Sequence, residues 1–172
     1  MNRNCWVWNN ICGGGELKRV FHYETEIGLI GIAEEDGYIS DIMFGIEGPE
    51  GAEKVETRLI RKAFGQIAEY LSGTRKSFDL PLLVEGTEFQ EKVWNELLKI
   101  PYGETRTYGK VAEAVGNPKA VRAVGAANNR NALPIIIPCH RVVGANGSLT
   151  GYSGGLEAKR KLLEIEEKNK VK

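Results

Sequence analysis

The stretch Leu133-Pro134-Ile135-Ile136-Ile137-Pro138-Cys139-His140-Arg141-Val142 sets a cysteine and a histidine side by side at the end of an apolar run. A short β-branched run bounded by prolines is typical of a buried strand, so residues 133–137 are predicted to form one. On such a strand Cys139 and His140 would point to opposite faces. Burial raises a thiol pKa, and His140 could offset this through a water molecule. The alternative is a core cysteine with a chance neighbour.

Length and composition limit the class of protein. A chain of 172 residues fits one large domain or two small ones. No apolar stretch is long enough to span a membrane, and the first residues lack a signal-peptide pattern. Three cysteines, Cys5, Cys12 and Cys139, suit a reducing compartment better than a disulfide framework. The sequence therefore predicts a cytoplasmic protein.

The charges are divided unequally between the two halves of the chain, although the formal net charge is zero. Residues 1–86 carry 9 Lys and Arg against 14 Asp and Glu, whereas residues 87–172 carry 14 against 9. Between Thr105 and Arg141 six cations accompany one acid: Arg106, Lys110, Lys119, Arg122, Arg130 and Arg141 against Glu113. A local basic face of this kind can meet phosphates even when the whole chain is neutral, and a mixed solvated surface is the alternative.

The first half has the pattern of a small α+β domain. Strands are predicted over residues 17–23, 27–33 and 38–44, and Asp36-Gly37 is a two-residue hairpin turn between the last two. A helix is predicted from apolar residues at helical spacing, with Gly73 as its stop: Val55, Leu59, Ala63, Ile67 and Tyr70. Ser77–Gly86, which contains Pro81, is predicted to be a linker.

The second half is predicted to be mostly helical. Thr87 and Gln90 form a capping box at the start of a helix that ends before Pro101, and Thr107 can cap the next helix. Gly116-Asn117-Pro118 is a tight turn, with Asn117 as cap and Pro118 as first residue of a helix to Asn128. Two short helices around a turn suggest a helix-turn-helix, although an ordinary helical hairpin has the same spacing. A last helix carries Leu156, Leu162, Leu163 and Ile165 as apolar anchors.

The helix after this turn is rich in small residues, namely Ala120, Ala123, Gly125, Ala126 and Ala127. Val121 and Val124 are expected to pack inward. Small residues allow a close approach of the backbone, either to a neighbouring helix or to a ligand.

Two segments resemble one known family. Asn131, the five residues Pro138–Val142 and the run Tyr152-Ser153-Gly154-Gly155-Leu156 resemble the active-site segment of O6-alkylguanine-DNA alkyltransferases. The resemblance extends from about Thr87 to Glu166, and the N-terminal half is similar only in its order of strands and helix. It implies an α+β fold. Residues 1–86 would form a small α/β domain with a three-stranded antiparallel, ribonuclease H-like sheet. Residues 87–172 would form a mainly helical domain with a winged-helix-like helix-turn-helix for DNA binding and alkyl transfer.

The resemblance also implies an activity. Such a protein flips O6-methylguanine, and also O4-methylthymine, out of double-stranded DNA held through the minor groove. It then transfers the alkyl group irreversibly to Cys139, once per molecule. It is expected to act as a monomer, without a cofactor or a metal.

Residue roles follow from the same resemblance. Cys139 is the nucleophile and alkyl acceptor, and a water, His140 and Glu166 activate it, while Asn131 ties the approach loop to the active-site backbone. Arg122 fills the gap left by the flipped base. The base would be bound by Tyr108, by the backbone of Cys139, Val142 and Ser153, and by a pocket with Tyr152, Gly154 and Pro134. The DNA would also contact Lys119, Ala123, Ala126, Ala127 and Arg130.

Several further alternatives stay open. Gly154 leaves space beside the alkyl group, so ethyl and benzyl-sized groups are expected to be accepted. A lesion-binding protein of the same fold would lack the thiol, and a cysteine hydrolase would need an oxyanion hole that no motif suggests. Cys5, Cys12 and His22 could bind zinc, but no second histidine or CxxC pair accompanies them, so His22 is expected to be a half-buried strand residue.

Overall fold

The computed structural model describes the backbone of residues 6–8 and, with their side chains, residues 18–170. The chain divides into two compact units, Met1–Glu85 and Gly86–Lys172. Both strands and helices are present, so the expected α+β class is confirmed. Within the described residues, no helix combines the length and the apolar composition needed to cross a membrane.

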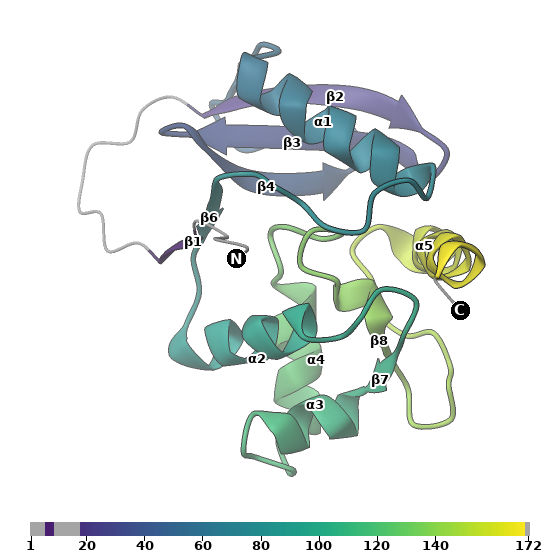
Figure 1. Cartoon of the computed structure of the whole chain (residues 1–172). Coiled ribbons are helices and arrows are strands. Elements are labelled where there is room, and N and C mark those ends of the chain that lie inside the picture. The colour runs from purple at the N-terminus through teal and green to yellow at the C-terminus, as the bar shows by residue number, and fades with distance from the viewer. Residues whose placement is uncertain (1–5, 9–17, 171–172) are drawn as a thin grey trace. The chain divides into compact units, whose positions relative to one another are not determined.

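The first unit is built on a mixed sheet of six strands in the order β1-β6-β4-β3-β2-β5 (Figure 1). The strands are β1 (Trp6–Trp8), β2 (Arg19–Thr25), β3 (Gly28–Glu35), β4 (Tyr38–Phe44), β5 (Glu53–Lys54) and β6 (Leu82–Val84). The central strands β2, β3 and β4 are antiparallel, as expected. The short strands β5 and β6 pair parallel with β2 and β4, and β1 pairs parallel with β6.

The expected number of three strands is therefore wrong. Leu82, Leu83 and Val84 lie in the segment that was predicted to be a linker, yet all three are buried and form β6. A run of three residues is too short for an alternating pattern to distinguish it from a linker. The Asp36-Gly37 turn is confirmed, because both residues have the positive φ, 51° and 81°, that such a hairpin requires.

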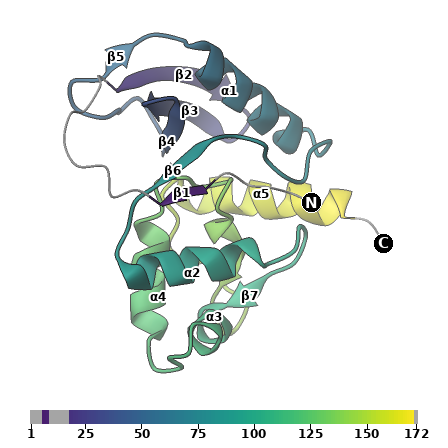
Figure 2. The same ribbon diagram turned by 60° about the vertical axis from the view of Figure 1, so that its left-hand side comes forward.

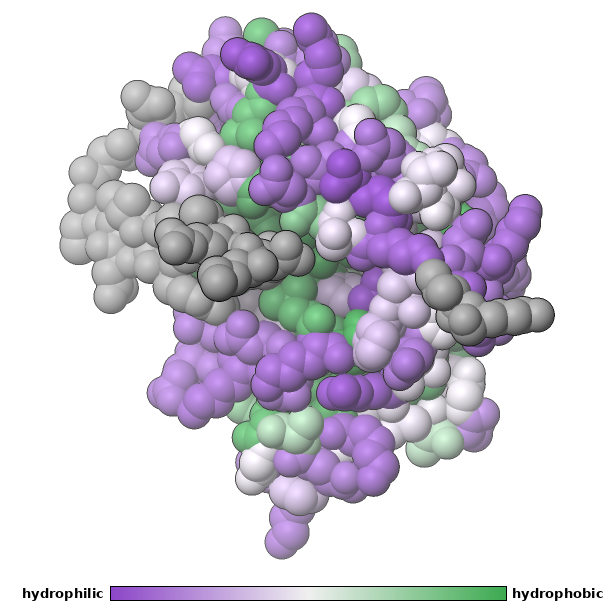
Figure 3. Space-filling view, in the orientation of Figure 1, coloured by the Kyte–Doolittle hydropathy of each residue, from purple (hydrophilic) through white to green (hydrophobic). Residues whose placement is uncertain are grey.

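Helix α1 (Arg58–Leu71) covers one face of this sheet (Figures 1 and 2). Thr57 caps it, accepting from Ile60 N and donating to Glu34 of β3. Val55 is exposed and lies outside the helix, contrary to expectation. The outward side of α1 is charged, in keeping with the hydrophilic colouring that covers much of Figure 3; it carries Arg58, Arg61, Lys62 and Glu69.

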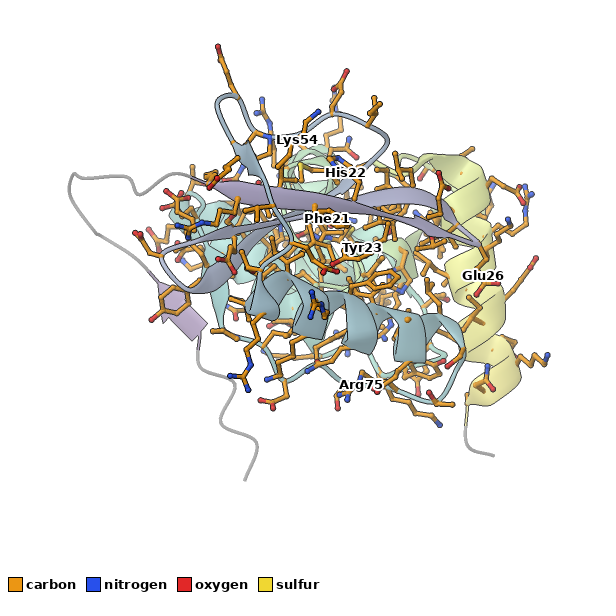
Figure 4. All side chains as sticks on the ribbon, turned by 90° about the horizontal axis from the view of Figure 1, so that it is seen from above. Phe21, His22, Tyr23, Glu26, Lys54 and Arg75 are labelled. Carbon is orange, nitrogen blue, oxygen red and sulfur yellow. The ribbon has the colours of Figure 1, made fainter. Side chains whose placement is uncertain are left out.

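Successive side chains of β2, labelled in Figure 4, contact different neighbours. Tyr23 stacks on Phe64 of α1, with ring centroids 3.8 Å apart, and donates a hydrogen bond to Glu56 (2.8 Å). His22 is half-buried beside Gly31, and its Nε2 lies 3.1 Å from Glu47 O. His22 is thus the half-buried strand residue that was expected.

The second unit contains four α-helices, one 3-10 turn and a two-stranded ladder within its described residues (Figure 2). These are α2 (Glu88–Leu98), β7 (Arg106–Thr107), α3 (Tyr108–Ala114), α4 (Val121–Asn129), the 3-10 turn η1 (Cys139–Arg141), β8 (Val142–Val143) and α5 (Gly155–Asn169). The capping box of Thr87 with Gln90 and the cap at Thr107 are both confirmed.

Helix α4 begins three residues later than expected. Pro118 and Lys119 lie in a turn that Ala120 N closes by donating to Asn117 O (2.9 Å), so Asn117 does not cap the helix. The cap position is Ala120, without a side-chain hydrogen bond. Because this turn uses the backbone groups of residues 117–120, regular helical bonding starts only at Val121.

Strands β7 and β8 pair in parallel, Arg106 with Val142 and Thr107 with Val143. Tyr108 directly follows β7, and β8 directly follows the turn that contains Cys139. This short ladder fixes the start of α3 against the cysteine segment, although more than thirty residues separate them in the sequence.

Candidate active site

The run before the cysteine is a compact turn and not the strand that was expected. Ile137 N donates to Leu133 O (2.8 Å), and Ile135 has a φ of 75°, which is rare for a β-branched residue. The prolines at 134 and 138 have no N–H to donate, so they interrupt any strand ladder through this segment. The run is buried, as its apolar composition indicated, but it is not extended.

A second tight turn delivers the cysteine. Pro138 has φ −80° and ψ 61°, and Cys139 N donates to Ile137 O (2.7 Å), which is the geometry of an inverse γ-turn. Cys139, His140 and Arg141 then form η1. Cys139 and His140 are therefore not neighbours on an extended strand, and the expected opposition of their side chains does not apply.

Asn131 holds these turns together. Its Nδ2 donates to Ile137 O (2.9 Å), and its Oδ1 accepts from Leu133 N (3.0 Å). The side chain is buried, and both ends of its amide are used. Through these two hydrogen bonds, Asn131 joins the approach loop to the backbone just before Cys139.

The Cys139 thiol is nearly closed off from solvent, with 4% of the residue exposed. Burial raises its pKa to about 11, and the hydrogen bond of Asn131, the positive charge of Lys159 and nearby backbone N–H groups act in the opposite direction. The resting group is therefore a thiol at neutral pH, and its reactivity depends on groups that favour the thiolate.

His140 and Glu166 are both buried and in direct contact. His140 Nε2 lies 2.8 Å from Glu166 Oε1, across 26 residues of sequence. Burial on its own would raise the pKa of Glu166, but its hydrogen bonds and ion pairs with His140 and Arg141 lower that pKa to about 2. Burial lowers the pKa of His140, against the attraction of Glu166.

These protonation states define the tautomer of His140. An ionised carboxylate can only accept, so His140 Nε2 carries the proton and donates it to Glu166. In a neutral imidazole Nδ1 is then the basic nitrogen. The ring of His140 meets that of Tyr152 edge-on, with centroids 6.4 Å apart.

The position of Arg141 differs from the expectation, which placed it among the cations of an exposed basic face. It is buried instead, and its Nε lies 3.0 Å from both oxygens of Glu166. Its Nη1 donates to Ile100 O (2.7 Å). Its charge thus balances Glu166 and is not available to a ligand at the surface.

Glu166 also holds the loop after α2. Gly103 N donates to Glu166 Oε2 (2.8 Å). Gly103 has φ 79°, and a Cβ at this position would come within 2.7 Å of the Lys170 side chain. Glycine therefore allows the close approach that this hydrogen bond requires.

Lys159 of α5 is a site residue that the sequence analysis missed. It is fully buried, and its ammonium donates to Val142 O (2.7 Å) and Thr150 O (2.8 Å). In the sequence it is one of many charges in a helix with alternating acids and bases, so no local pattern distinguishes it.

The remaining residues of the expected pocket differ in how far they are exposed to solvent. Tyr108 is half-buried, and its hydroxyl donates weakly to Thr150 O (3.4 Å). Pro134 and Val142 are buried, Tyr152 and Gly154 are half-buried, and Ser153 is exposed. Leu156, an expected anchor of α5, is 46% exposed, whereas Leu162 is buried.

Helix α4 presents small and basic residues to solvent. Arg122, Ala123, Ala126 and Arg130 are exposed, as is Lys119 in the turn before the helix. Val124 packs inward as expected, but Val121 is 41% exposed. Ala127 is buried, and its carbonyl accepts from the Trp94 indole (3.0 Å), so it does not belong to this exposed face.

No cluster of three potential metal ligands occurs among the described residues. Cys5 and Cys12 lie outside the part of the chain that the structure describes, so the zinc alternative with His22 stays a prediction.

Comparisons with known proteins agree on one family. The family model described as "6-O-methylguanine DNA methyltransferase, DNA binding domain" matches residues 88–168. A methylated-DNA–protein-cysteine methyltransferase of Methanosarcina acetivorans is 49% identical over 84% of this chain and 95% of that protein. The constitutive enzyme of Bacillus subtilis is 50% identical over 83% of this chain and 92% of that protein.

Solved structures give the same result. The chain resembles the Mycobacterium tuberculosis O6-methylguanine methyltransferase, with a TM-score of 0.82 and 39% identity over 90% of this chain and 96% of that one. The M. tuberculosis OGT in complex with DNA matches with a TM-score of 0.81 and 40% identity over 88% of this chain and 94% of that chain. On the strength of these matches over most of its length, the chain belongs to the methylated-DNA–protein-cysteine methyltransferase family.

Proposed function

We propose that this protein repairs O6-methylguanine, and also O4-methylthymine, in double-stranded DNA by moving the alkyl group to its own Cys139. The observation that carries the proposal is the buried thiol next in sequence to a histidine that is oriented by an ionised carboxylate. Family membership supplies the substrate class, since the relatives are named methylated-DNA–protein-cysteine methyltransferases.

The proposed reaction is an in-line displacement. The Cys139 proton passes through a water to Nδ1 of His140, and the resulting thiolate attacks the alkyl carbon. The new S–C bond forms as the C–O6 bond breaks, and the electron pair stays on the guanine, which takes up a proton. Overall a methyl moves from oxygen to sulfur and a proton from sulfur to the base, so no cofactor is consumed.

Negative charge develops on the departing base, and donors placed there stabilise the transition state. Tyr108 Oη and the N–H of Ser153 are the proposed donors. The carbonyls of Cys139 and Val142 would accept from the exocyclic amine and so select guanine. The thioether has no bond that water can cleave readily, so each molecule reacts once.

A base in a duplex must leave the stack to reach a buried thiol. We propose that α3 and α4 act as a winged-helix-like helix-turn-helix, with α4 in the minor groove, where small side chains such as Ala123 and Ala126 permit close approach. Arg122 would enter the stack in place of the flipped base. Lys119 and Arg130, both exposed, would contact phosphates.

The two units have separate roles in this proposal. The second unit would bind DNA and transfer the alkyl group as a monomer. The first unit would have a ribonuclease H-like arrangement, to which we assign no catalytic group. Gly154 and Pro134 would line the alkyl pocket with little side chain, which favours acceptance of ethyl and benzyl groups beside methyl.

The direct test is the intact mass of the protein after incubation with a duplex that carries one O6-methylguanine. We expect one added methyl per chain, located at Cys139 by peptide mapping. Neither Cys139→Ala nor a duplex with unmodified guanine should give it. Selective, tight binding of the lesion without any mass gain would overturn the transferase proposal and identify a lesion sensor.

A further inference from the structure

A polar side chain on helix α4 is buried without a hydrogen-bond partner. Asn128 is 6% exposed, and neither its Nδ2 nor its Oδ1 forms a hydrogen bond with any residue that the structure describes. Its backbone is regular, because Asn128 O accepts from Asn131 N (3.2 Å). A buried amide without partners costs free energy, and such a group in a folded protein calls for an explanation.

The helical register places Asn128 beside a residue of the proposed base-binding pocket. Residues three and four apart share one face of a helix, so Asn128 shares a face with Val124 and Gly125. Val124 is fully buried, and a Cβ added at Gly125 would lie 3.9 Å from the Tyr108 ring. Asn128 therefore lies on the side of α4 between the core of the second unit and Tyr108, whose hydroxyl is a proposed donor to the base.

The residues next to Asn128 lead to the nucleophile and already have their partners. Asn131 uses both ends of its amide on the loop before Cys139. On the side of α2, the Trp94 indole donates to Ala127 O (3.0 Å). The Asn128 amide thus lies between Tyr108 and the approach loop, where neither of these neighbouring groups is left to pair with it.

The burial and the chemistry of this amide identify the kind of partner that it suits. A carboxamide carries donors and an acceptor in one plane, which matches the polar edge of a nucleobase. The sugars and phosphates of bound DNA stay at the protein surface, whereas a side chain that is 6% exposed can be reached only by a group that enters the interior. A flipped base is such a group.

We propose that Asn128 is a further binding residue for the flipped base, and that its amide forms hydrogen bonds with the polar edge of that base. The inference rests on the proposed function and adds a side chain of α4 to the base-binding groups named there. The unpaired amide is a cost to the stability of the free protein, and binding of the base recovers this cost.

The first test replaces Asn128 by leucine, which has a similar shape and no polar side-chain atoms. We expect Asn128→Leu to melt about 2–4 °C above the native protein, because it removes a buried unpaired amide. Methyl transfer from subsaturating O6-methylguanine duplex should nevertheless slow about tenfold, the equivalent of 1.4 kcal/mol. Asn129→Leu is the matched control, because this neighbouring amide is exposed and its loss should not raise the melting temperature.

The substrate distinguishes a contact with the base from a contact with the DNA strand. Asn128→Leu should also slow methyl transfer from free O6-methylguanine, a nucleobase that has no sugar or phosphate. Slowing on the duplex alone, or on neither substrate, would overturn the proposal. A lower melting temperature would overturn it as well, because it would mean that the amide is already paired in the free protein.

A second measurement does not depend on transfer or on the folding of Asn128→Leu. In isotopically labelled Cys139→Ala, the side-chain NH2 signals of Asn128 should shift when a duplex with one O6-methylguanine is added. They should not shift in the same way with the unmodified duplex. A shift that depends on the lesion would support the base contact even if the native protein gained no methyl. Without such a shift the base contact is rejected, even if the gain of a methyl at Cys139 confirms repair.

Discussion

Glu166 forms several of the buried polar contacts of the second unit. It meets His140, Arg141 and the backbone of Gly103, so it joins the active-site turn to the loop after α2 and to α5. Removing one partner of a buried ion pair leaves the other charge uncompensated in the interior. Glu166 therefore has a structural role beside the proposed orientation of His140.

We expect Glu166→Gln to lower the free energy of unfolding by about 3–5 kcal/mol, the usual cost of breaking a buried pair. Transfer should also slow, because a neutral amide no longer fixes the basic nitrogen of His140. Urea unfolding and single-turnover transfer would measure the two effects. Glu164→Gln, at an exposed position of the same helix, is the control. Equal stability of the two variants would contradict this role.

The same residues predict how stability depends on pH. The pKa of Glu166 is lowered from 4.5 to about 2 in the folded protein, so its stabilising contribution is present above pH 4.5 and is lost as the pH falls toward 2. The pKa of His140 is lowered from 6.5, so protonation of the unfolded chain costs stability below pH 6.5.

Melting temperature should therefore decline in two stages as the pH is lowered from 8, first below 6.5 and again below 4.5. Thermal melts at constant ionic strength would record both stages. In Glu166→Gln the second stage should shrink, because the group that titrates is gone. If the melting temperature of this variant fell below pH 4.5 by as much as that of the native protein, other carboxylates would be responsible for the acid sensitivity.

At the scale of elements, several local side-chain signals predicted the structure correctly, although the expected cap at Asn117 was wrong, and the irregular backbone was not predicted. Thr87, Thr107 and the Asp36-Gly37 turn act through neighbours a few residues away, so the sequence reveals them directly. The turn before α4 and the folded run 133–137 depend on backbone hydrogen bonds that no side-chain pattern encodes. β6 needs a distant partner strand before its three residues become recognisable.

The residues of the active site also differ in whether the sequence identifies them. Cys139, His140, Asn131 and Glu166 could be selected because a short, specific motif and a family resemblance named them. Lys159 and the pairing of Arg141 could not, because both follow from where α5 packs against η1. A charge in the sequence does not indicate whether its side chain will be buried.

Helix α4 gives a prediction that separates two kinds of DNA contact. If Arg122 fills the gap in the stack, Arg122→Ala should slow transfer from duplex at least about tenfold, or 1.4 kcal/mol. It should matter much less on a single strand, which has no paired stack to fill. Single-turnover rates on both substrates would test this.

Arg130 is the matched comparison, because it is exposed at the end of the same helix. As a phosphate contact, Arg130→Ala should weaken duplex binding and reduce the salt slope by about 0.9, with little effect on transfer at saturation. An equal loss for Arg122→Ala on single and double strands would rule out the gap-filling role.

At the scale of the whole molecule, the residues 1–86 and 87–172 have net charges of −5 and +5 within a neutral chain. Burial of Arg141 and the contact of Arg106 with Glu96 (3.9 Å) reduce the exposed part of this excess. The cations at Lys119, Arg122 and Arg130 stay exposed around one short helix. Net charge therefore says less about DNA binding than this local arrangement does.

The final prediction concerns the molecule after it has reacted. Adding a methyl to a buried sulfur strains a packed site by about 1–3 kcal/mol. For a chain of this size, each kcal/mol corresponds to about 2–4 °C in melting temperature.

The methylated protein should therefore melt several degrees below the native one at equal concentration. The sample would be prepared with lesion duplex and freed of DNA. Cys139→Ala carried through the same treatment controls for the effect of handling. The unfolded thioether carries no such strain, so the difference in stability should lie mainly in the folded state. Hydrogen exchange near η1 should therefore be faster in the methylated protein than in the native one. Identical midpoints for the native and methylated proteins would mean that the site accepts the methyl without cost, and the spent protein would then persist as stably as the active one.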